Sequence, residues 1–461
     1  MLHSASRGLA AALLVATVAA AGGCAGDDLA TGPLPASPTV PAIATGTDEP
    51  VPTAHPTPTA ASRSTAAPHP DATPSPSSEA APTPAPVQES TEVSTPAPAQ
   101  ESTAAPTATP MPAPRQARLA FTGDLLSHSP VFRQAQANGN DDLDFDYRPM
   151  FEPVRATLSD ADLAICHLET PLSPDNRNLS GYPLFNAPGD LASAIAEVGY
   201  DGCSTASNHS LDQGTGGIIA TLNLFDEADL GHAGMARTPQ EAATPTLYEV
   251  NGITIGHLSY TYGLNGLILP DDQTWAVNVI STDDILAEAR AAIGAGADFV
   301  VLSIQWGAEY RVAPTEQQRA LAKELLAGDE IDLIVGTHAH VIQPVEFIGG
   351  NYVIYGLGNF LSNQSPQSCR SCPLESADGV IVQVDLVEGE SGDIRVASIG
   401  AVPTWVDRRT FTIIDVGAAL AGNSFPELTS QLEQSLARTS STLRSYGVDV
   451  WVATSGTPDA G

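Results

Sequence analysis

Short polar segments of the chain carry the residue types that bind divalent metals and transfer protons. They are Gly123-Asp124, His167-Leu168-Glu169, Ser207-Asn208-His209 with Asp212, Gln305-Trp306-Gly307 and His338-Ala339-His340. Their carboxylates, amides and imidazoles form a mixture of oxygen and nitrogen donors that suits Mn, Fe, Zn or Mg. A single histidine more often makes a structural hydrogen bond than binds a metal, so each segment alone is a weak signal. Together the segments predict a metal site.

The His338-Ala339-His340 segment is the most specific of these signals. In an extended turn after a strand, side chains two residues apart can diverge toward two ions about 3.5–4 Å apart, the spacing of two-metal hydrolytic sites. A surface HxH without a ligand role is the alternative, and the other segments argue against it. The serines around His209 invite a serine-hydrolase interpretation, but no GxSxG motif surrounds them.

Apolar runs of strand length precede polar clusters and would position them. These runs are 118–122, 163–166, 253–260, 299–304 and 331–335. Apolar residues at helical spacing occur at 188–198, 216–226, 282–295 and 315–326. Later strands are expected at 352–355, 380–386 and 395–402, before a last helix at 428–443. The pattern predicts an α/β domain whose sheet begins parallel or mixed and gains antiparallel strands, with sites at the strand ends.

The N-terminus has the pattern of an export signal. An apolar run at 9–21 follows a short segment with one firm positive charge, and Gly22 and Gly23 precede Cys24. The run is too short to span a membrane. Small residues before a cysteine resemble a bacterial lipobox, which predicts that residues 1–24 are a lipoprotein signal and that lipidated Cys24 anchors the chain to the outer face of the cell membrane. Ordinary cleavage with an incidental cysteine is the alternative.

Residues 25–115 are rich in Pro, Thr, Ala and Ser and include the related repeats PTPAPVQEST and STPAPAQEST. This composition cannot bury a core, so we expect a disordered, semi-rigid spacer. At about 3.1 Å per residue, its roughly 90 residues could extend beyond about 200 Å, enough to cross a wall layer. The composition permits O-glycosylation, with a passive tether as the simpler interpretation. The folded domain is expected at 116–455, and a disordered tail at 456–461.

The cysteines fit an oxidising compartment. If Cys24 is lipidated, Cys166, Cys203, Cys369 and Cys372 remain, an even number that permits two disulfides. The Cys369-Arg-Ser-Cys372 pair has the spacing of a redox or half-zinc motif, but no second CxxC accompanies it. A disulfide between Cys369 and Cys372 that closes a loop is the preferred interpretation.

The order of the motifs resembles that of the CapA family of poly-γ-glutamate capsule synthesis proteins. The blocks that carry the resemblance run from Gly123 to Ser362 and are GDLL, DLAICHLETPLS, FNAPGDLASAI, STASNHSLDQG, IQWGAEY, IVGTHAHVIQPVE and YGLGNFLS. The combination of NHxxD, GTHAH and YGLGNF is specific, and the resemblance covers nearly the whole folded region. It implies a four-layer α/β/β/α sandwich of the metallophosphatase (calcineurin-like phosphoesterase) kind.

The resemblance also implies two divalent ions, of Mn, Fe, Zn or Mg, at the strand ends. The ligands that it assigns are Asp124, Glu169, Asn208, Gln305, His338 and His340. Asp124 and His340 would serve the first ion. Asn208 and His338 would serve the second ion, and Glu169 would bridge both, because a bridging group must be anionic to hold two cations close.

Further residues are assigned to catalysis and to orientation. His209 is the expected catalytic residue, which would contact the substrate or protonate the leaving oxygen. Asp212 and Glu309 are expected to orient histidines from behind the ligands. His167, next to Glu169, is expected to lie in the same outer layer and could compensate for a weakened ligand.

Two positions depart from the family pattern and weaken the predicted metal binding. Leu126 stands two residues after Asp124, where relatives carry histidine, and only His128 is near. Gln305 stands where many relatives carry the histidine of a His-Trp-Gly segment, and glutamine is a poorer donor for a borderline metal. The resemblance therefore leaves catalysis open.

Three functions fit these features. The resemblance implies a role in the synthesis, export or anchoring of an anionic capsule polymer such as poly-γ-glutamate, with membrane proteins of polymer synthesis as partners. An exported metallophosphoesterase unrelated to capsule is the second, and a non-catalytic protein that binds cell wall or polymer is the third. The net charge of −34, with Lys323 as the only lysine, argues against a nucleic-acid ligand.

Overall fold

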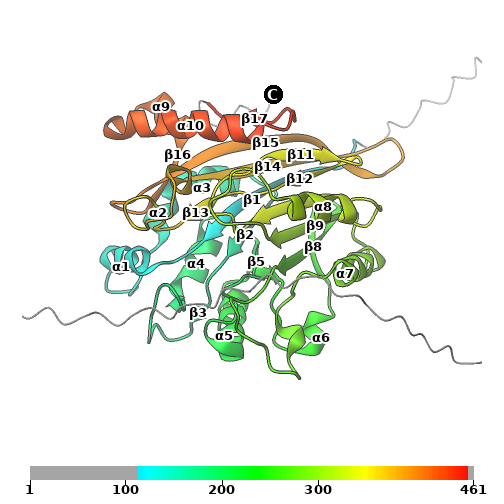
Figure 1. Cartoon of the computed structure of the whole chain (residues 1–461), viewed down its shortest axis with the longest axis horizontal. Coiled ribbons are helices and arrows are strands. Elements are labelled where there is room, and N and C mark those ends of the chain that lie inside the picture. The colour runs from blue at the N-terminus through cyan, green and yellow to red at the C-terminus, as the bar shows by residue number, and fades with distance from the viewer. Residues whose placement is uncertain (1–112, 455–461) are drawn as a thin grey trace, which may run out of the picture. The chain divides into compact units, whose positions relative to one another are not determined.

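The computed structural model describes residues 113–454 (Figure 1). The predicted signal, Cys24, the spacer as far as residue 112 and the tail 456–461 lie outside the described residues, so these remain predictions. Arg115 donates hydrogen bonds to Asp298 and Glu388, and the first strand begins at Gln116. Among the described residues, no helix combines the length and apolar character needed to cross a membrane.

The larger sheet combines parallel and antiparallel strands around β1. Its path is β16-β15-β14-β1-β2-β5-β6, with β13 beside β1 and β17 beside β15. The parallel strands are β1 (Gln116–Leu125), β2 (Leu163–Leu168), β5 (Gly202–Ser204), β6 (Gly231–Ala233) and β13 (Asn359–Leu361). The antiparallel strands are β14 (Asp378–Glu388), β15 (Ile394–Asp407) and β16 (Thr412–Asp415), and β17 (Trp451–Val452) runs parallel to β15.

The second sheet has the order β11-β12-β10-β9-β8-β7. Its inner strands are parallel: β8 (Ile253–Thr261), β9 (Phe299–Gln305), β10 (Leu333–Thr337) and β12 (Asn351–Ile354). Antiparallel strands close its edges: β7 (Thr246–Val250) and β11 (Val345–Ile348). A separate short pair is formed by β3 (Leu172–Ser173) and β4 (Ala187–Pro188).

Helices cover the outer face of each sheet (Figure 1). Against the larger sheet lie α1 (Ser129–Asn138), α2 (Arg148–Phe151), η1 (Glu152–Val154), α3 (Arg155–Ser159), α4 (Asp190–Glu197) and α5 (Gly214–Glu227). Against the second sheet lie α7 (Thr282–Gly294) and α8 (Glu316–Leu325). The remaining helical segments are α6 (Pro239–Ala242), η2 (Thr274–Ala276), η3 (Leu374–Ala377), α9 (Val416–Gly422), η4 (Pro426–Leu428) and α10 (Thr429–Leu443).

A continuous apolar core joins the two sheets. It contains Phe121 of β1 and Val382 of β14 from one sheet, and Val301 of β9 and Val335 of β10 from the other. Strands β2, β9 and β10 are buried at every residue because both of their faces are covered, which explains their unbroken apolar sequences. The layers are therefore helix, sheet, sheet and helix, and the predicted four-layer α/β/β/α fold is confirmed.

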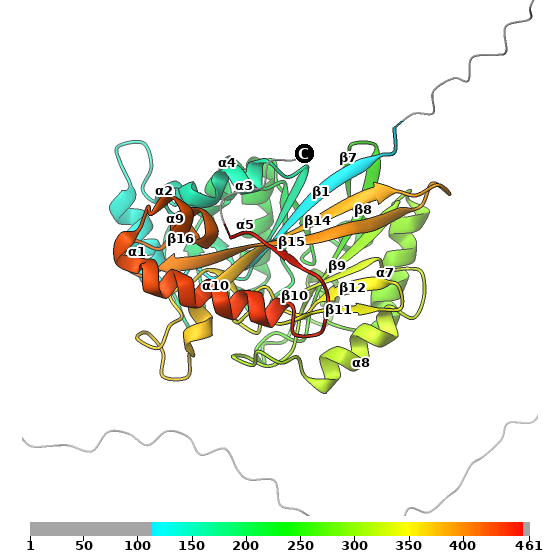
Figure 2. The same cartoon turned by 90° about the horizontal axis from the view of Figure 1, so that it is seen from above.

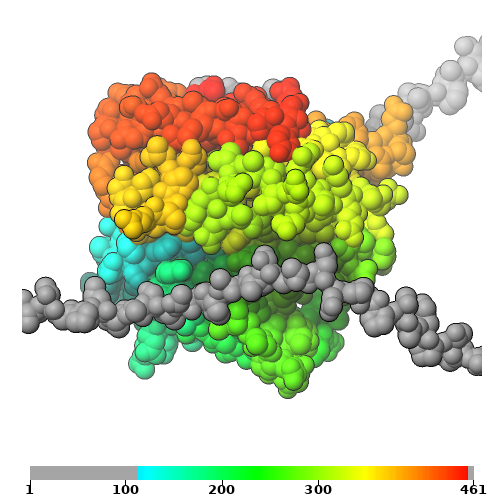
Figure 3. Space-filling view, in the orientation of Figure 1, coloured from blue at the N-terminus to red at the C-terminus, as the bar shows by residue number. Residues whose placement is uncertain are grey.

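The C-terminal helix α10 packs against two of the apolar clusters. It crosses β15 when the molecule is seen from above (Figure 2), and its Leu443 joins the core between the sheets. Leu432 packs with Ile414 and Val416 in a smaller apolar cluster. In Figure 3, α10 (red) lies along one edge of the visible face, with the gold segment that follows β13 below it. That segment contributes to the site described next.

Candidate functional site

The predicted site residues follow the ends of neighbouring strands. Asp124 is the penultimate residue of β1, in register with His167 of β2, and Glu169 follows β2 directly. In the second sheet, Gln305 ends β9 in register with Thr337 of β10. Because parallel strands bring their carboxyl ends to the same edge, segments far apart in the sequence converge there.

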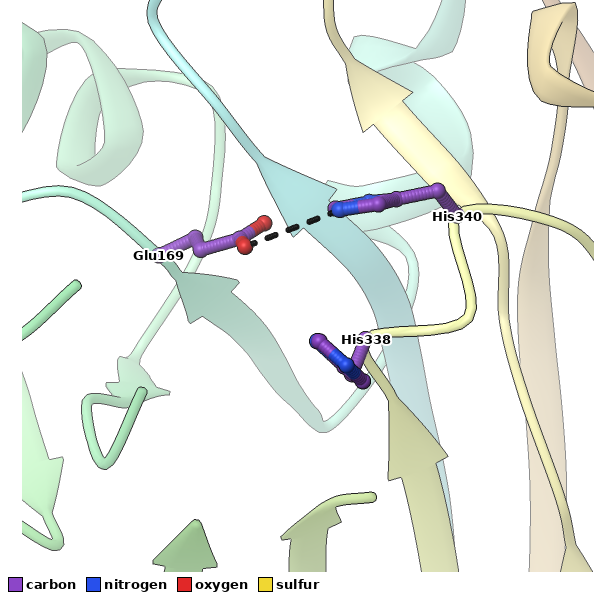
Figure 4. Close-up of side chains that lie close together, drawn as sticks. All are labelled: Glu169, His338 and His340. Carbon is purple, nitrogen blue, oxygen red and sulfur yellow. Dashed lines mark ion pairs between the residues drawn. The ribbon is translucent and has the colours of Figure 1, made fainter. Parts of the chain in front are cut away.

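Glu169, His338 and His340 form a buried group that we call the ion cluster (Figure 4). One ligand atom from each lies within 4.8 Å of the others, and His340 Nε2 lies 3.8 Å from Glu169 Oε1. Both histidines have left-handed backbone conformations, with φ of 87° and 55°. This conformation is uncommon outside glycine, and strained backbone of this kind concentrates at functional sites. The turn after β10 thus places both imidazoles beside one carboxylate.

His340 is held from behind by two side chains. Its Nδ1 lies 2.9 Å from Asp124 Oδ2 and 3.1 Å from Asn359 Oδ1. The other Asp124 oxygen accepts the backbone N–H of His338 at 3.4 Å. Both Asp124 oxygens are therefore used by the two histidines, in the manner of carboxylates that orient metal-binding imidazoles. The assignment of Asp124 as a direct ligand stays a prediction.

Burial and neighbouring charges shift the pKa values of all three residues of the ion cluster. Burial raises the pKa of Glu169 to about 8, against the opposing charge of His340. Burial would lower the pKa of His340, but Glu169 and Asp124 raise it to about 9. Burial also lowers the pKa of His338 to about 3, so this imidazole is neutral. Without a cation, His340 therefore carries the positive charge beside the two buried acids, and a bound cation would take over that role and favour the ionised form of Glu169.

A divalent cation fits the unpaired atoms of the ion cluster. Both Glu169 oxygens and His338 Nδ1 are buried without a hydrogen-bond partner among the described residues. Such atoms cost free energy unless a ligand satisfies them, on the order of 1–3 kcal/mol each. One carboxylate and two imidazoles form a donor set that suits borderline divalent metals. The structure therefore contains a candidate His/Glu metal site, as the sequence predicts.

Asn208 and Gln305, which we call the amide pair, lie deep in the site and bond to each other. The Asn208 backbone N–H donates to Gln305 Oε1 at 2.7 Å, and Gln305 Nε2 donates to Asn208 Oδ1 at 2.9 Å. Thr261 Oγ1 also donates to Gln305 Oε1 at 2.7 Å. Both residues were predicted as metal ligands, and that role remains untested. What the structure shows is two amides engaged with each other.

His209 lies on the wall of a cavity of about 340 Å³ that also reaches His340. Its Nδ1 lies 2.7 Å from Asp212 Oδ2, and Phe185 packs edge-on against its ring with centroids 4.7 Å apart. The Asp212 oxygen also accepts the Phe185 backbone N–H at 2.7 Å. Asp212 thus makes the orienting contact expected of it, and Nε2 is the ring nitrogen left for the cavity.

Other predicted residues lie around this centre. His167 is buried, its Nδ1 bonds to Ser204 Oγ at 2.9 Å, and its Nε2 has no partner among the described residues. It is not part of the ion cluster, whose members are the three residues named above. Glu309 is exposed at the rim of the cavity, where its charge acts on Glu169 and His340 from a distance.

Three residues of the site were not predicted. Asn359 bonds to His340, Tyr262 packs on His338 with ring centroids 4.4 Å apart, and Tyr310 lines the cavity. Asn359 and Tyr310 lie within the blocks YGLGNF and IQWGAEY that carry the family resemblance, which is the signal that could have found them. Tyr262 carries no such signal, because its position depends on the loop after β8.

Both disulfides that the cysteine count permits are formed. Cys369 pairs with Cys372, as predicted, in the segment after β13, and Cys369 lines the cavity. Cys166 pairs with Cys203 across neighbouring strands, with Cα atoms 4.3 Å apart. The second bridge joins β2, which leads to Glu169, to β5, which leads to Asn208 of the amide pair.

Comparisons with known proteins match much of the part of the chain that the structure describes. The profile described as "Bacterial capsule synthesis protein PGA_cap" matches residues 118–364. "Capsule biosynthesis protein CapA" of Bacillus anthracis is 29% identical over 224 residues, which cover 47% of this chain and 54% of the relative. "PGA biosynthesis protein CapA" of Bacillus subtilis is 26% identical over 293 residues, which cover 61% and 70%. The match thus spans about half the length of the first relative.

Among solved structures, the calcineurin-like phosphoesterase YfkN from Bacillus subtilis is similar at 12% identity and a TM-score of 0.39, covering 71% of this chain and 99% of that one. The fold assignment stands on the strand order and the core described above. The family profile covers more than half of the chain and includes every member of the ion cluster and the amide pair. The chain therefore belongs to the PGA_cap family of bacterial capsule synthesis proteins.

Proposed function

We propose that this chain is a lipid-anchored, extracytoplasmic protein that hydrolyses a phosphoester during the synthesis, export or anchoring of an anionic capsule polymer such as poly-γ-glutamate. Family membership supports the link to capsule. The single observation that carries the catalytic part is the ion cluster, whose buried ligand atoms lack partners among the described residues. The predicted lipidation of Cys24 supports the location, and membrane proteins of polymer synthesis are the proposed partners.

The ion cluster would hold the divalent cation, with Glu169, His338 and His340 as its ligands. Mn, Fe and Zn suit this donor set best, and Mg is disfavoured by the two imidazoles. The two-ion arrangement that the sequence predicts would need Asp124 at the first ion and the amide pair at the second. When bound, a divalent cation supplies polarisation of a phosphoryl oxygen and neutralises negative charge on it.

His209 would give a proton to the leaving oxygen. Its Nδ1 bonds to Asp212, so Nε2 is the nitrogen that can hold a proton toward the cavity. Phe185 packs edge-on against the ring, and the buried Asp212 carboxylate orients it through Nδ1. Tyr310 and Tyr182 line the same cavity. In this proposal, Asp212 and Phe185 orient His209, and His209 transfers the proton to the leaving oxygen.

The test uses the full-length chain, freed of metal and reloaded with Mn²⁺ or Zn²⁺, with bis(p-nitrophenyl) phosphate as substrate. We expect metal-dependent release of p-nitrophenol that His338→Ala abolishes. His232→Ala is the matched control, because His232 is a half-buried histidine that does not line the cavity. Bound metal without turnover would contradict hydrolysis and would favour a non-catalytic polymer-binding protein. In producing cells, loss of surface polymer with His338→Ala separates a capsule role from an unrelated exported phosphoesterase.

A further inference from the structure

We infer that this site is built for a single divalent ion at the ion cluster, and that Gln305 closes the second ion position by holding Asn208 in the amide pair. The inference rests on the proposed metal centre and sharpens it. Its basis is the contrast between ligand atoms that are already satisfied and ligand atoms that have no partner.

Gln305 is 1% exposed and uses every hydrogen-bonding position of its amide. Its Oε1 accepts the Asn208 backbone N–H and the Thr261 hydroxyl, each at 2.7 Å. Its Nε2 donates to Asn208 Oδ1 at 2.9 Å and to Ser207 Oγ at 3.2 Å. An amide oxygen has two lone pairs, and both are occupied here. Binding an ion through this oxygen would break buried hydrogen bonds.

The orientation of the Gln305 amide follows from its neighbours. A backbone N–H can only donate, so the Gln305 atom 2.7 Å from the Asn208 nitrogen has to be the oxygen. The NH₂ group then faces Asn208 Oδ1, the atom that would bind the second ion. Asn208 Nδ2 in turn donates to Asn265 Oδ1 at 3.2 Å. Asn208 is therefore fixed at both ends of its amide.

In the ion cluster, by contrast with the amide pair, ligand atoms lack hydrogen bonds within the described part of the chain. Both Glu169 oxygens and His338 Nδ1 lie buried without a hydrogen-bond partner among residues 113–454. An ion there gains ligands without breaking a hydrogen bond of Glu169 or of His338 Nδ1. An ion at the amide pair would give up several hydrogen bonds, each with a net value of about 1 kcal/mol, and would leave buried donors unpaired.

Histidine at position 305 could not reproduce these contacts. A neutral imidazole offers one acceptor and one donor, whereas Gln305 accepts twice and donates twice. A histidine would therefore release Asn208 Oδ1 and add a nitrogen ligand at the same point. Gln305→His is thus expected to open the second ion position.

The experiment counts ions rather than turnover. Full-length wild type, Gln305→His and the matched control Gln434→His, at an exposed glutamine of α10, are stripped of metal and reloaded with Mn²⁺. Elemental analysis gives the ions per chain, and electron paramagnetic resonance distinguishes an isolated Mn²⁺ from the exchange-coupled pair expected of ions about 3.5–4 Å apart. Circular dichroism checks that each variant is folded.

We expect one isolated ion in wild type and in Gln434→His, and a coupled pair in Gln305→His. A coupled pair in wild type would overturn the inference while leaving the proposed metal centre intact. One ion in folded Gln305→His would overturn the role given to Gln305. No bound Mn²⁺ in wild type would overturn the proposed metal centre, and the inference with it. Because wild type alone gives a decisive count, the test does not depend on the variant folding.

Discussion

The ion cluster and the amide pair occupy the same end of the two sheets but satisfy their polar atoms in different ways. In the ion cluster, buried acceptor atoms of Glu169 and His338 have no partner among the described residues. In the amide pair, Asn208 and Gln305 bond to each other. A buried polar group without a partner is costly, and in the ion cluster such atoms converge within 4.8 Å with a third ligand atom, which points to a shared ligand. The contrast teaches that ligand residue types alone do not define a metal site, because their hydrogen bonds decide which are available.

The largest effect is expected from His340→Ala. The change removes a ligand of the ion cluster and leaves Asp124 buried without the histidine that it orients. Metal affinity should fall by at least about 100-fold, the upper end of what loss of an orienting partner alone costs. Titration calorimetry on the full chain measures it, with His232→Ala as the control. Unchanged affinity or metal content would show that the ion cluster is not the metal site.

The next effect concerns proton transfer beside the ion cluster. His209→Ala should lower kcat by about 10²–10⁴-fold for a substrate with a poor leaving group, because such an oxygen needs a proton as it departs. The loss should be much smaller for p-nitrophenolate, which leaves without one. Asp212→Asn should follow the same pattern more weakly. Equal losses for both substrates would contradict general acid catalysis by His209.

The third prediction concerns the disulfide that joins the two regions. Cys166 and Cys203 are 37 residues apart in sequence, so replacing both by alanine should lower the free energy of unfolding by about 4 kcal/mol on the loop-entropy estimate. The matched pair Cys369 and Cys372, separated by 3 residues, should cost about 2 kcal/mol. Guanidinium denaturation measures both. A larger loss from the second pair would contradict the expected order.

The last prediction is a pH dependence confined to the metal-free ion cluster. Burial raises the pKa of Glu169 to about 8 from an ordinary value near 4.5, and the pKa of His340 rises to about 9 from 6.5. Both folded-state values lie above the unfolded ones, so each group stabilises the fold at low pH. The Glu169 contribution is lost as pH rises from about 4.5 to about 8, and the His340 contribution between about 6.5 and 9.

Thermal melting of chelator-treated protein between pH 5 and pH 9 tests this dependence. The fall in Tm across that range should be shallower in Glu169→Gln than in wild type, because the variant has no carboxylate to ionise. Bound metal should remove most of the wild-type dependence. Parallel pH profiles for the two metal-free proteins would contradict the assigned shift.

Much of the fold could be predicted because long apolar runs mark buried strands. The run 299–304 was predicted as a strand from its sequence alone, and it lies in β9, which is buried at every residue. β5 was missed because it has only 3 residues, and its identity comes from pairing with β2 and β6. The helices α1 to α3 were also missed. α1 has only two fully buried residues, Val131 and Ala135, so its apolar periodicity is weak.

The candidate site could be predicted in its residue types but not in its bonding. His338 and Glu169 are recognisable from the polar segments after strands. The contact of Asn359 with His340 was not predictable, because it requires β13 to pair with β1 in register with Asp124. The bond between Asn208 and Gln305 links residues 97 positions apart: Asn208 lies in the turn after β5 of one sheet, and Gln305 ends β9 of the other. Spacing in the sequence carries no information on such contacts.

One measurement tests the central claim most directly. Crystals of the chain grown with Mn²⁺ and measured at an X-ray energy where Mn scatters anomalously would locate every bound ion. We predict one anomalous peak, among Glu169, His338 and His340, with Gln305 still bonded to Asn208. A peak at the amide pair would contradict the account of Gln305, and the absence of a peak at the ion cluster would contradict the proposed metal centre.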